Sequence, residues 1–182
     1  MANAMVKFKL LVHYICSSCQ DDLSRLGATK LNKILWYAEI EHFFRTGEPL
    51  TGVKYVKLQH GPAPACMPHV IAELERDKVL LVRDVPYYGQ EKKEYITLKV
   101  PEGIDGFFTA TDISALERQI NVICEKHTAK SISQKSHDKA WELAEMGEDL
   151  PFYTALAIPG EFTKSDLEWL DERVGIEERR IA

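Results

Sequence analysis

Apolar residues recur at helical spacing in several stretches of the chain, separated by segments rich in glycine, proline and charge. From Phe8 to Cys19 they stand three or four residues apart, which predicts an amphipathic helix. In the next stretch Thr29 has the chemistry of a helix N-cap and Gly47 that of a stop. The same criteria predict further helices over residues 67–77, from Thr111 or Asp112 through Ile123, over about 131–146 and over about 163–175.

Three short segments instead favour strands. Residues 53–58 alternate β-branched or aromatic residues with lysine, as an edge strand does. Residues 79–85 and 94–100 are rich in β-formers and flank Pro86-Tyr87-Tyr88-Gly89-Gln90, which predicts a hairpin with a long tip. Between the first strand and the helix at 67–77, Gly61-Pro62-Ala63-Pro64 predicts a sharp turn.

These elements predict a mostly α fold with a small antiparallel β element, an α+β class. A helix followed by a two-stranded hairpin is the order of a winged-helix module, and we expect a winged-helix-like helix plus β-hairpin inside a helical domain. No repeat or linker divides the chain. We therefore expect one domain over 1–182, with a core at about 6–147 and a C-terminal helical extension at about 148–176.

Charge and composition narrow the possible partners. The formal net charge is -5, and the helix at 67–77 carries Glu73, Glu75 and Asp77 against Arg76 alone. A phosphate backbone repels such a surface, so a nucleic acid is an unlikely partner. The chain lacks an apolar run of the ~20 residues that a membrane span requires, and it lacks a secretion signal at its start. We expect a cytoplasmic protein that does not bind membranes, and Met1–Ala4 reads as a tag remnant or an alternative start.

The residues with catalytic or metal-binding potential do not form a recognisable site. Cys16 and Cys19 have C-x-x-C spacing but close a helix, whereas redox pairs open one, and burial as small apolar side chains explains them better. Ser136-His137-Asp138 are consecutive, so their side chains diverge by about 100° on a helix and cannot form a triad. Common nucleotide, zincin and hydrolase motifs are absent. We predict no catalytic residue, no cofactor and no metal; an enzyme built on the cysteines, with His60, Cys66 and His69 as further zinc donors, is a less favoured alternative.

Two aromatic pairs are candidates for contact with a protein partner. Tyr87 and Tyr88 occupy the predicted hairpin tip, where burial within one chain is hard to arrange. His137 and Trp141 stand four residues apart, so on one helix they share a face and their rings can stack. Either pair has an alternative role: the tyrosines fold back onto the domain, or His137 and Trp141 lock a helix onto the core.

Several motifs, taken together, resemble one known family. They are Lys30-Leu31-Asn32-Lys33-Ile34-Leu35-Trp36-Tyr37-Ala38, Thr46-Gly47-Glu48-Pro49-Leu50, His60-Gly61-Pro62, and Ser136-His137 with Trp141. Their order and spacing resemble the Panacea domain, the SocA-like antitoxin family, often labelled phage-associated protein. The chain departs from the family at Gln59-His60, where an aromatic residue commonly precedes the Gly-Pro pair.

The resemblance implies a bacterial or phage protein that neutralises a toxin encoded beside it, by direct binding or as an adaptor that delivers the toxin to a protease. It implies neither catalysis nor a cofactor. The motif residues expected to have a structural role are Lys30, Leu31, Lys33, Tyr37, Gly47, Pro49, Gly61 and Pro62. The alternative is a winged-helix-like DNA-binding regulator of its own operon, for which the acidic helix at 67–77 is unfavourable.

Overall fold

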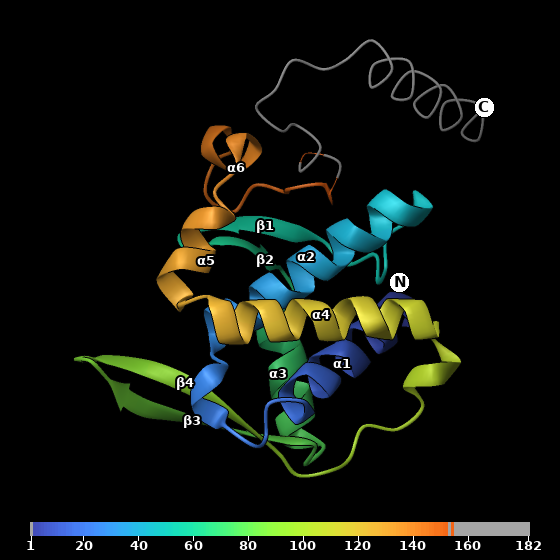
Figure 1. The fold of residues 1–182 in the computed structure, drawn as a ribbon, viewed down its shortest axis with the longest axis vertical. Helices are drawn as coiled ribbons and strands as arrows, with labels where there is room; N and C mark the ends of the chain where they lie inside the picture. Colours follow the sequence, from blue (N-terminus) through green and yellow to red (C-terminus); the bar gives the residue numbers. More distant parts are fainter. Residues whose placement is uncertain (1, 153, 155–182) are drawn as a thin grey trace.

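The computed structural model describes residues 2–152 and 154. Helix α2 (Ala28–Thr46) runs through the centre of the molecule and packs against α1 (Ala2–Ser17) and α4 (Ala110–Lys126) (Figure 1). The apolar stripes predicted from the sequence face one another across these contacts, and the buried core includes Phe8, Leu11, Ile15, Leu31, Ile34, Leu35, Leu116, Ile120 and Ile123. The α+β class, mostly helical with small antiparallel β elements, is therefore confirmed.

The ends of the helices follow their capping groups. Gly47 ends α2 in the left-handed conformation, with φ of 75°, and donates its N–H to Phe43 O. The start of α2 differs from the prediction, because Gly27 rather than Thr29 is the N-cap and supplies no side-chain hydrogen bond. At α4 the predicted cap is also wrong. Thr109 caps the helix and Asp112 is its partner in a capping box, which moves the first turn back by two to three residues.

Helix α3 (Met67–Arg76) and the hairpin of β3 (Leu80–Tyr87) and β4 (Gln90–Thr97) follow one another as predicted. The long hairpin tip is wrong. Pro86 pairs with Glu91 inside the ladder, and only Tyr88 and Gly89 form the turn. Both have positive φ, 48° and 77°, as a two-residue type I′ turn requires. A winged-helix arrangement of these elements stays a prediction.

A second hairpin joins β1 (Tyr55–Leu58) to β2 (Gly61–Pro64) in antiparallel register. The predicted turn at residues 61–64 is thus a strand. Pro62 lies opposite Lys57 and Pro64 opposite Tyr55, two residues apart, so both prolines occupy positions that donate no hydrogen bond to the partner strand. Residues 147–150 cover the other edge of β1: Lys57 N donates to Glu148 O at 2.9 Å and Leu150 N to Tyr55 O at 2.8 Å.

The single helix predicted at about 131–146 is two short helices, α5 (Ala129–Lys135) and α6 (Lys139–Leu143). The break arises because Asp138 accepts a hydrogen bond from Trp141 N at 2.8 Å and starts a new helix. Short 3-10 helices lie at η1 (Leu23–Arg25) and η2 (Ile104–Gly106). The helix predicted at 163–175 lies outside the described residues.

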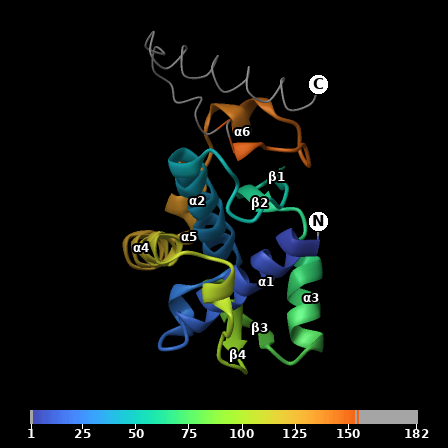
Figure 2. The ribbon, with the colours of Figure 1, turned by 90° about the vertical axis from the view of Figure 1, so that its right-hand side faces the viewer.

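The two hairpins lie at different ends of the molecule. Seen from the side, β1, β2 and α6 are near one end of the long axis and β3 with β4 near the other (Figure 2). Of the helices within residues 2–152, none is both long and apolar enough to cross a membrane.

Candidate functional site

Residues of three motifs that are distant in sequence, Lys33, Gly61-Pro62 and Ser136, meet around Gly61. This glycine begins β2, is buried, and has φ of 96°. A Cβ at this position would overlap the Oγ of Ser136 and the Nζ of Lys33. Gly61 is therefore required for two reasons: its backbone conformation, and the close approach of side chains from α2 and from the end of α5.

Lys33 brings a buried amine into this contact. The side chain is only 1% exposed, and Nζ donates to Pro62 O at 2.6 Å. Burial lowers the pKa of Lys33 to about 7. Among residues 2–152, no carboxylate forms an ion pair with this amine. Buried charges are normally paired, so Lys33 is an unusual feature of the fold.

His137 and Trp141 stack as the sequence suggested, although not from one helix. His137 lies in the α5–α6 linker, and its ring is 3.6 Å from that of Trp141 with an interplanar angle of 3°. Trp141 Nε1 donates to Leu58 O at 3.1 Å, and Lys57 Nζ lies 4.3 Å from the indole ring centroid. Burial, together with the nearby Lys33, His60 and Lys57, lowers the pKa of His137. The stacked pair thus ties α6 to β1.

Glu39 holds the segment of the Thr46-Gly47-Glu48-Pro49-Leu50 motif in place, and the sequence analysis did not identify this residue. Its carboxylate is 1% exposed and accepts hydrogen bonds from Leu50 N at 2.8 Å, from Thr51 N at 3.1 Å and from the Thr51 hydroxyl. Burial raises the pKa of Glu39 to about 7, against the hydrogen bonds from Thr51 and Leu50 that lower it. These bonds hold the segment around Gly47 and Pro49 against α2. The one signal in the sequence was an acidic residue between two apolar positions, Ala38 and Ile40.

The remaining motif residues of α2 lie on its packed faces. Leu31 is fully buried, and Lys30 Nζ donates to Cys124 O of α4 at 3.0 Å. Tyr37 is largely covered; its burial, together with the nearby Asp138, raises its pKa to about 12. Their positions fit the structural role implied by the resemblance, which stays a prediction.

Tyr87 and Tyr88 lie apart from this cluster, at the β3–β4 tip. Their side chains are 52% and 92% exposed, and their rings meet edge to face at 4.8 Å. Figures 1 and 2 both place the tip away from α5 and α6, so the two candidate aromatic pairs do not form one surface.

Other titratable groups have partners within the domain. His42 Nδ1 lies 2.8 Å from Asp112 Oδ1, and Arg45 contacts the same oxygen. Burial of Asp112 is outweighed by hydrogen bonds from Thr109, His42 and Arg45, which hold its pKa well below the usual range. The Asp112 side chain therefore joins α4 to α2, a long-range contact that no local pattern revealed.

The acidic groups of α3 also contact their own domain. Glu73 pairs with Lys9 of α1, and Glu75 Oε1 accepts the backbone N–H of Val82 at 3.1 Å. The DNA-binding alternative gains no support from α3 and stays a prediction.

The cysteines of the C-x-x-C pair are buried. Cys19 Sγ lies 3.9 Å from Cys124 Sγ of α4, and burial raises the pKa of Cys16. Within the described part of the chain, no three His, Cys, Asp or Glu side chains are placed to hold a metal ion.

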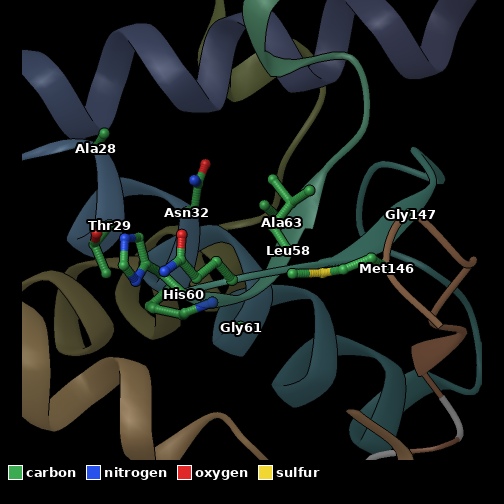
Figure 3. A pocket seen from close by; sticks show the side chains of 11 residues that line it. Ala28, Thr29, Asn32, Leu58, His60, Gly61, Ala63, Met146 and Gly147 are labelled. Atoms are coloured by element: carbon green, nitrogen blue, oxygen red, sulfur yellow. The ribbon is translucent and has the colours of Figure 1, made fainter. Parts of the chain in front are cut away.

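A pocket of about 570 Å³ opens beside the Gly61 contact. In Figure 3, Thr29 and His60 lie at one end of it, Asn32 lies between, and Met146 lies at the other end. The walls come from the start of α2, the β1–β2 hairpin and the segment after α6: Ala28, Thr29, Asn32, Lys33, Leu58, Gln59, His60, Gly61, Ala63, Met146 and Gly147.

The structure thus defines a mostly helical α+β fold in which residues of three motifs meet around one buried glycine. Residues 31–142 match the family described as antitoxin SocA-like, Panacea domain, and the chain belongs to that family. The membership gives it an antitoxin-type role, with a toxin as its partner in general terms. Comparison with curated proteins and with solved structures gave no match.

Proposed function

We propose that this protein neutralises a toxin encoded beside its own gene, in the cytoplasm, by binding the toxin directly or by delivering it to a protease. The observation that carries the proposal is the family match over residues 31–142, which spans each motif from Leu31 to Trp141. Both routes require a stable complex between two proteins, so the protein acts as an interaction module.

The β3–β4 tip is the better supported of the two aromatic candidates for toxin contact. Tyrosine is enriched at protein interfaces, and Tyr88 is 92% exposed. Its φ of 48° is unfavourable for a tyrosine, and the first position of a type I′ turn prefers asparagine, aspartate or glycine. The conformation of the turn therefore does not favour a tyrosine at position 88, and its exposed ring supports a role in contact with a partner.

His137 and Trp141 are a second candidate contact, beside the β1–β2 hairpin. Support for them is weaker, because Trp141 already has partners within the domain: Leu58 O, the His137 ring and Lys57. A role in locking α6 onto β1 accounts for most of their geometry.

We expect Tyr88→Asn to weaken toxin binding by about 30-fold, the loss of about 2 kcal/mol typical of an interface hot spot. The melting temperature should stay the same or rise, because asparagine suits the left-handed position better than tyrosine. Isothermal titration calorimetry and thermal denaturation measure the two effects.

Leu143→Asn is the matched control. Leu143 is 75% exposed on α6, so its replacement removes a similarly exposed apolar side chain away from the tip. Unchanged toxin affinity for Tyr88→Asn, or an equal loss for both variants, would contradict the tip assignment.

Co-expression tests the proposed function in cells. We expect the adjacent gene to arrest growth when expressed alone and growth to recover when this protein is expressed with it. Immunoblotting of the toxin separates the two routes: its level is maintained under direct neutralisation and falls under delivery to a protease. A neighbour that is harmless alone, or equally toxic with this protein present, is inconsistent with the proposal.

A further inference from the structure

We propose that the pocket beside Gly61 binds a small organic anion, a carboxylate or phosphate group carried on an apolar body. The pocket has the Lys33 amine in one wall, the unpaired amide oxygen of Asn32 near the start of α2 and apolar side chains on the other side. Its volume of about 570 Å³ is ordinary for a small-ligand site. The inference concerns this protein alone and does not depend on the toxin.

The main support for this proposal is the buried amine of Lys33. It is 1% exposed, lines the pocket, and is hydrogen-bonded only to Pro62 O among the described residues. An ammonium group has three N–H donors, so two are left without an acceptor. Without a counter-ion the protonated form of this buried amine is costly, and burial therefore shifts Lys33 toward its neutral form. An anion bound in the pocket supplies the missing partner.

Two further features of α2 can supply hydrogen-bond donors to an anion in this pocket. The buried Oδ1 of Asn32 has no hydrogen-bond partner, and turning that amide over would present its NH2 group to an oxyanion. Ala28 and Thr29, in the first turn of α2, line the pocket, and Gly27 provides no side-chain cap for that helix. The first N–H groups of a helix are not used within it and favour an anion.

The opposite side of the pocket suits an apolar group. Leu58, Ala63 and Met146 line it, and Figure 3 draws them together away from Thr29 and His60. A bare inorganic ion would leave these side chains in contact with water, so the geometry favours an anion with an organic body.

The inference predicts a pH dependence. The ionisable group that interacts electrostatically with Lys33 is His137 of the α5–α6 linker, which His60, Lys57 and Asp138 also influence; His60 of the β1–β2 turn lines the same pocket. Burial lowers the pKa of Lys33 to about 7. Above that pH the Lys33 amine is mostly neutral and must take up a proton from solvent when the anion binds. Affinity should therefore be greatest below pH 7 and fall by up to about tenfold per pH unit above it.

The test is titration of the purified protein with benzoate and with phenyl phosphate, followed by NMR, with benzamide as the uncharged control. We expect both anions to bind in about the millimolar range, as suits ligands of roughly ten non-hydrogen atoms, and benzamide to bind at least about tenfold more weakly. Affinity for both anions should fall between pH 6 and pH 8.

Two variants locate the site. Lys33→Met removes the cation with little change in volume, and Ala28→Asp places a repelling carboxylate where a helix N-terminus tolerates one. Each should weaken anion binding by about tenfold or more, and Ala28→Asp keeps the test decisive if Lys33→Met does not fold. Absence of binding by either anion, equal binding of benzamide, or undiminished binding by a folded variant would overturn the inference. None of these outcomes bears on whether the protein neutralises a toxin.

Discussion

Replacing Gly61 with alanine is expected to destabilise the protein by about 3 kcal/mol or more. The backbone conformation at φ of 96° costs a residue with a side chain about 1–3 kcal/mol. The added Cβ also overlaps Ser136 Oγ and Lys33 Nζ, and forced repacking of this kind costs about 1–3 kcal/mol. Both side chains are buried, so neither can move aside freely.

Thermal and urea denaturation measure this effect. A loss of about 3 kcal/mol corresponds to a fall in melting temperature of about 6–12 °C for a domain of this size. Gly103→Ala is the matched control: Gly103 also has positive φ, 74°, but a Cβ there meets nothing within 4 Å. The control should lose about 1 kcal/mol. Equal losses in the two variants would show that the contact with Lys33 and Ser136 does not constrain Gly61.

Replacing Glu39 with alanine is expected to cost about 4 kcal/mol. The variant leaves the backbone N–H groups of Leu50 and Thr51 buried without an acceptor, at about 1–3 kcal/mol each. The segment that follows α2 would separate from the helix. Glu39→Gln should lose less, because its amide oxygen still accepts one of these hydrogen bonds.

Urea denaturation of Glu39→Ala, Glu39→Gln and Glu102→Ala checks the second prediction. Glu102 is an exposed glutamate of the loop before η2, and its replacement should change the free energy of unfolding by less than about 0.5 kcal/mol. If Glu39→Ala behaved like Glu102→Ala, the carboxylate would not anchor residues 50 and 51.

The periodicity of apolar residues predicted the helices well and their interruptions poorly. The stripe of α4 was correct, but its start depends on competition between nearby caps, which Thr109 wins through its reciprocal bonds with Asp112. The break before α6 likewise depends on one hydrogen bond, from Trp141 N to Asp138. Differences between such caps amount to about 1 kcal/mol, less than pattern reasoning resolves.

The strand at residues 61–64 shows a different limit. Two prolines in four residues normally indicate a turn. Here they alternate with Gly61 and Ala63, so the residues between them carry the ladder. This alternation can be interpreted only once the partner strand is known, because the pairing determines which positions must donate an N–H.

The centre of the candidate site was visible only as separate motifs. Lys33, Gly61 and Ser136 lie in three segments, and no local pattern places them in contact. The resemblance identified these positions without a physical reason, and the structure supplies one: the glycine admits a buried lysine and a serine that a Cβ would displace. The pairing of His42 with Asp112 was missed for the same reason, since 70 residues separate them.

The proposal that this protein binds a toxin encoded by the adjacent gene is best tested by measuring their complex. Direct neutralisation and delivery to a protease both require that complex. The measurement is calorimetric titration of this protein with that product carrying an inactivating substitution. We expect saturable binding with Kd of about 1 μM or tighter for the wild type and about 30-fold weaker binding for Tyr88→Asn. Absence of binding by the folded wild-type protein would contradict it.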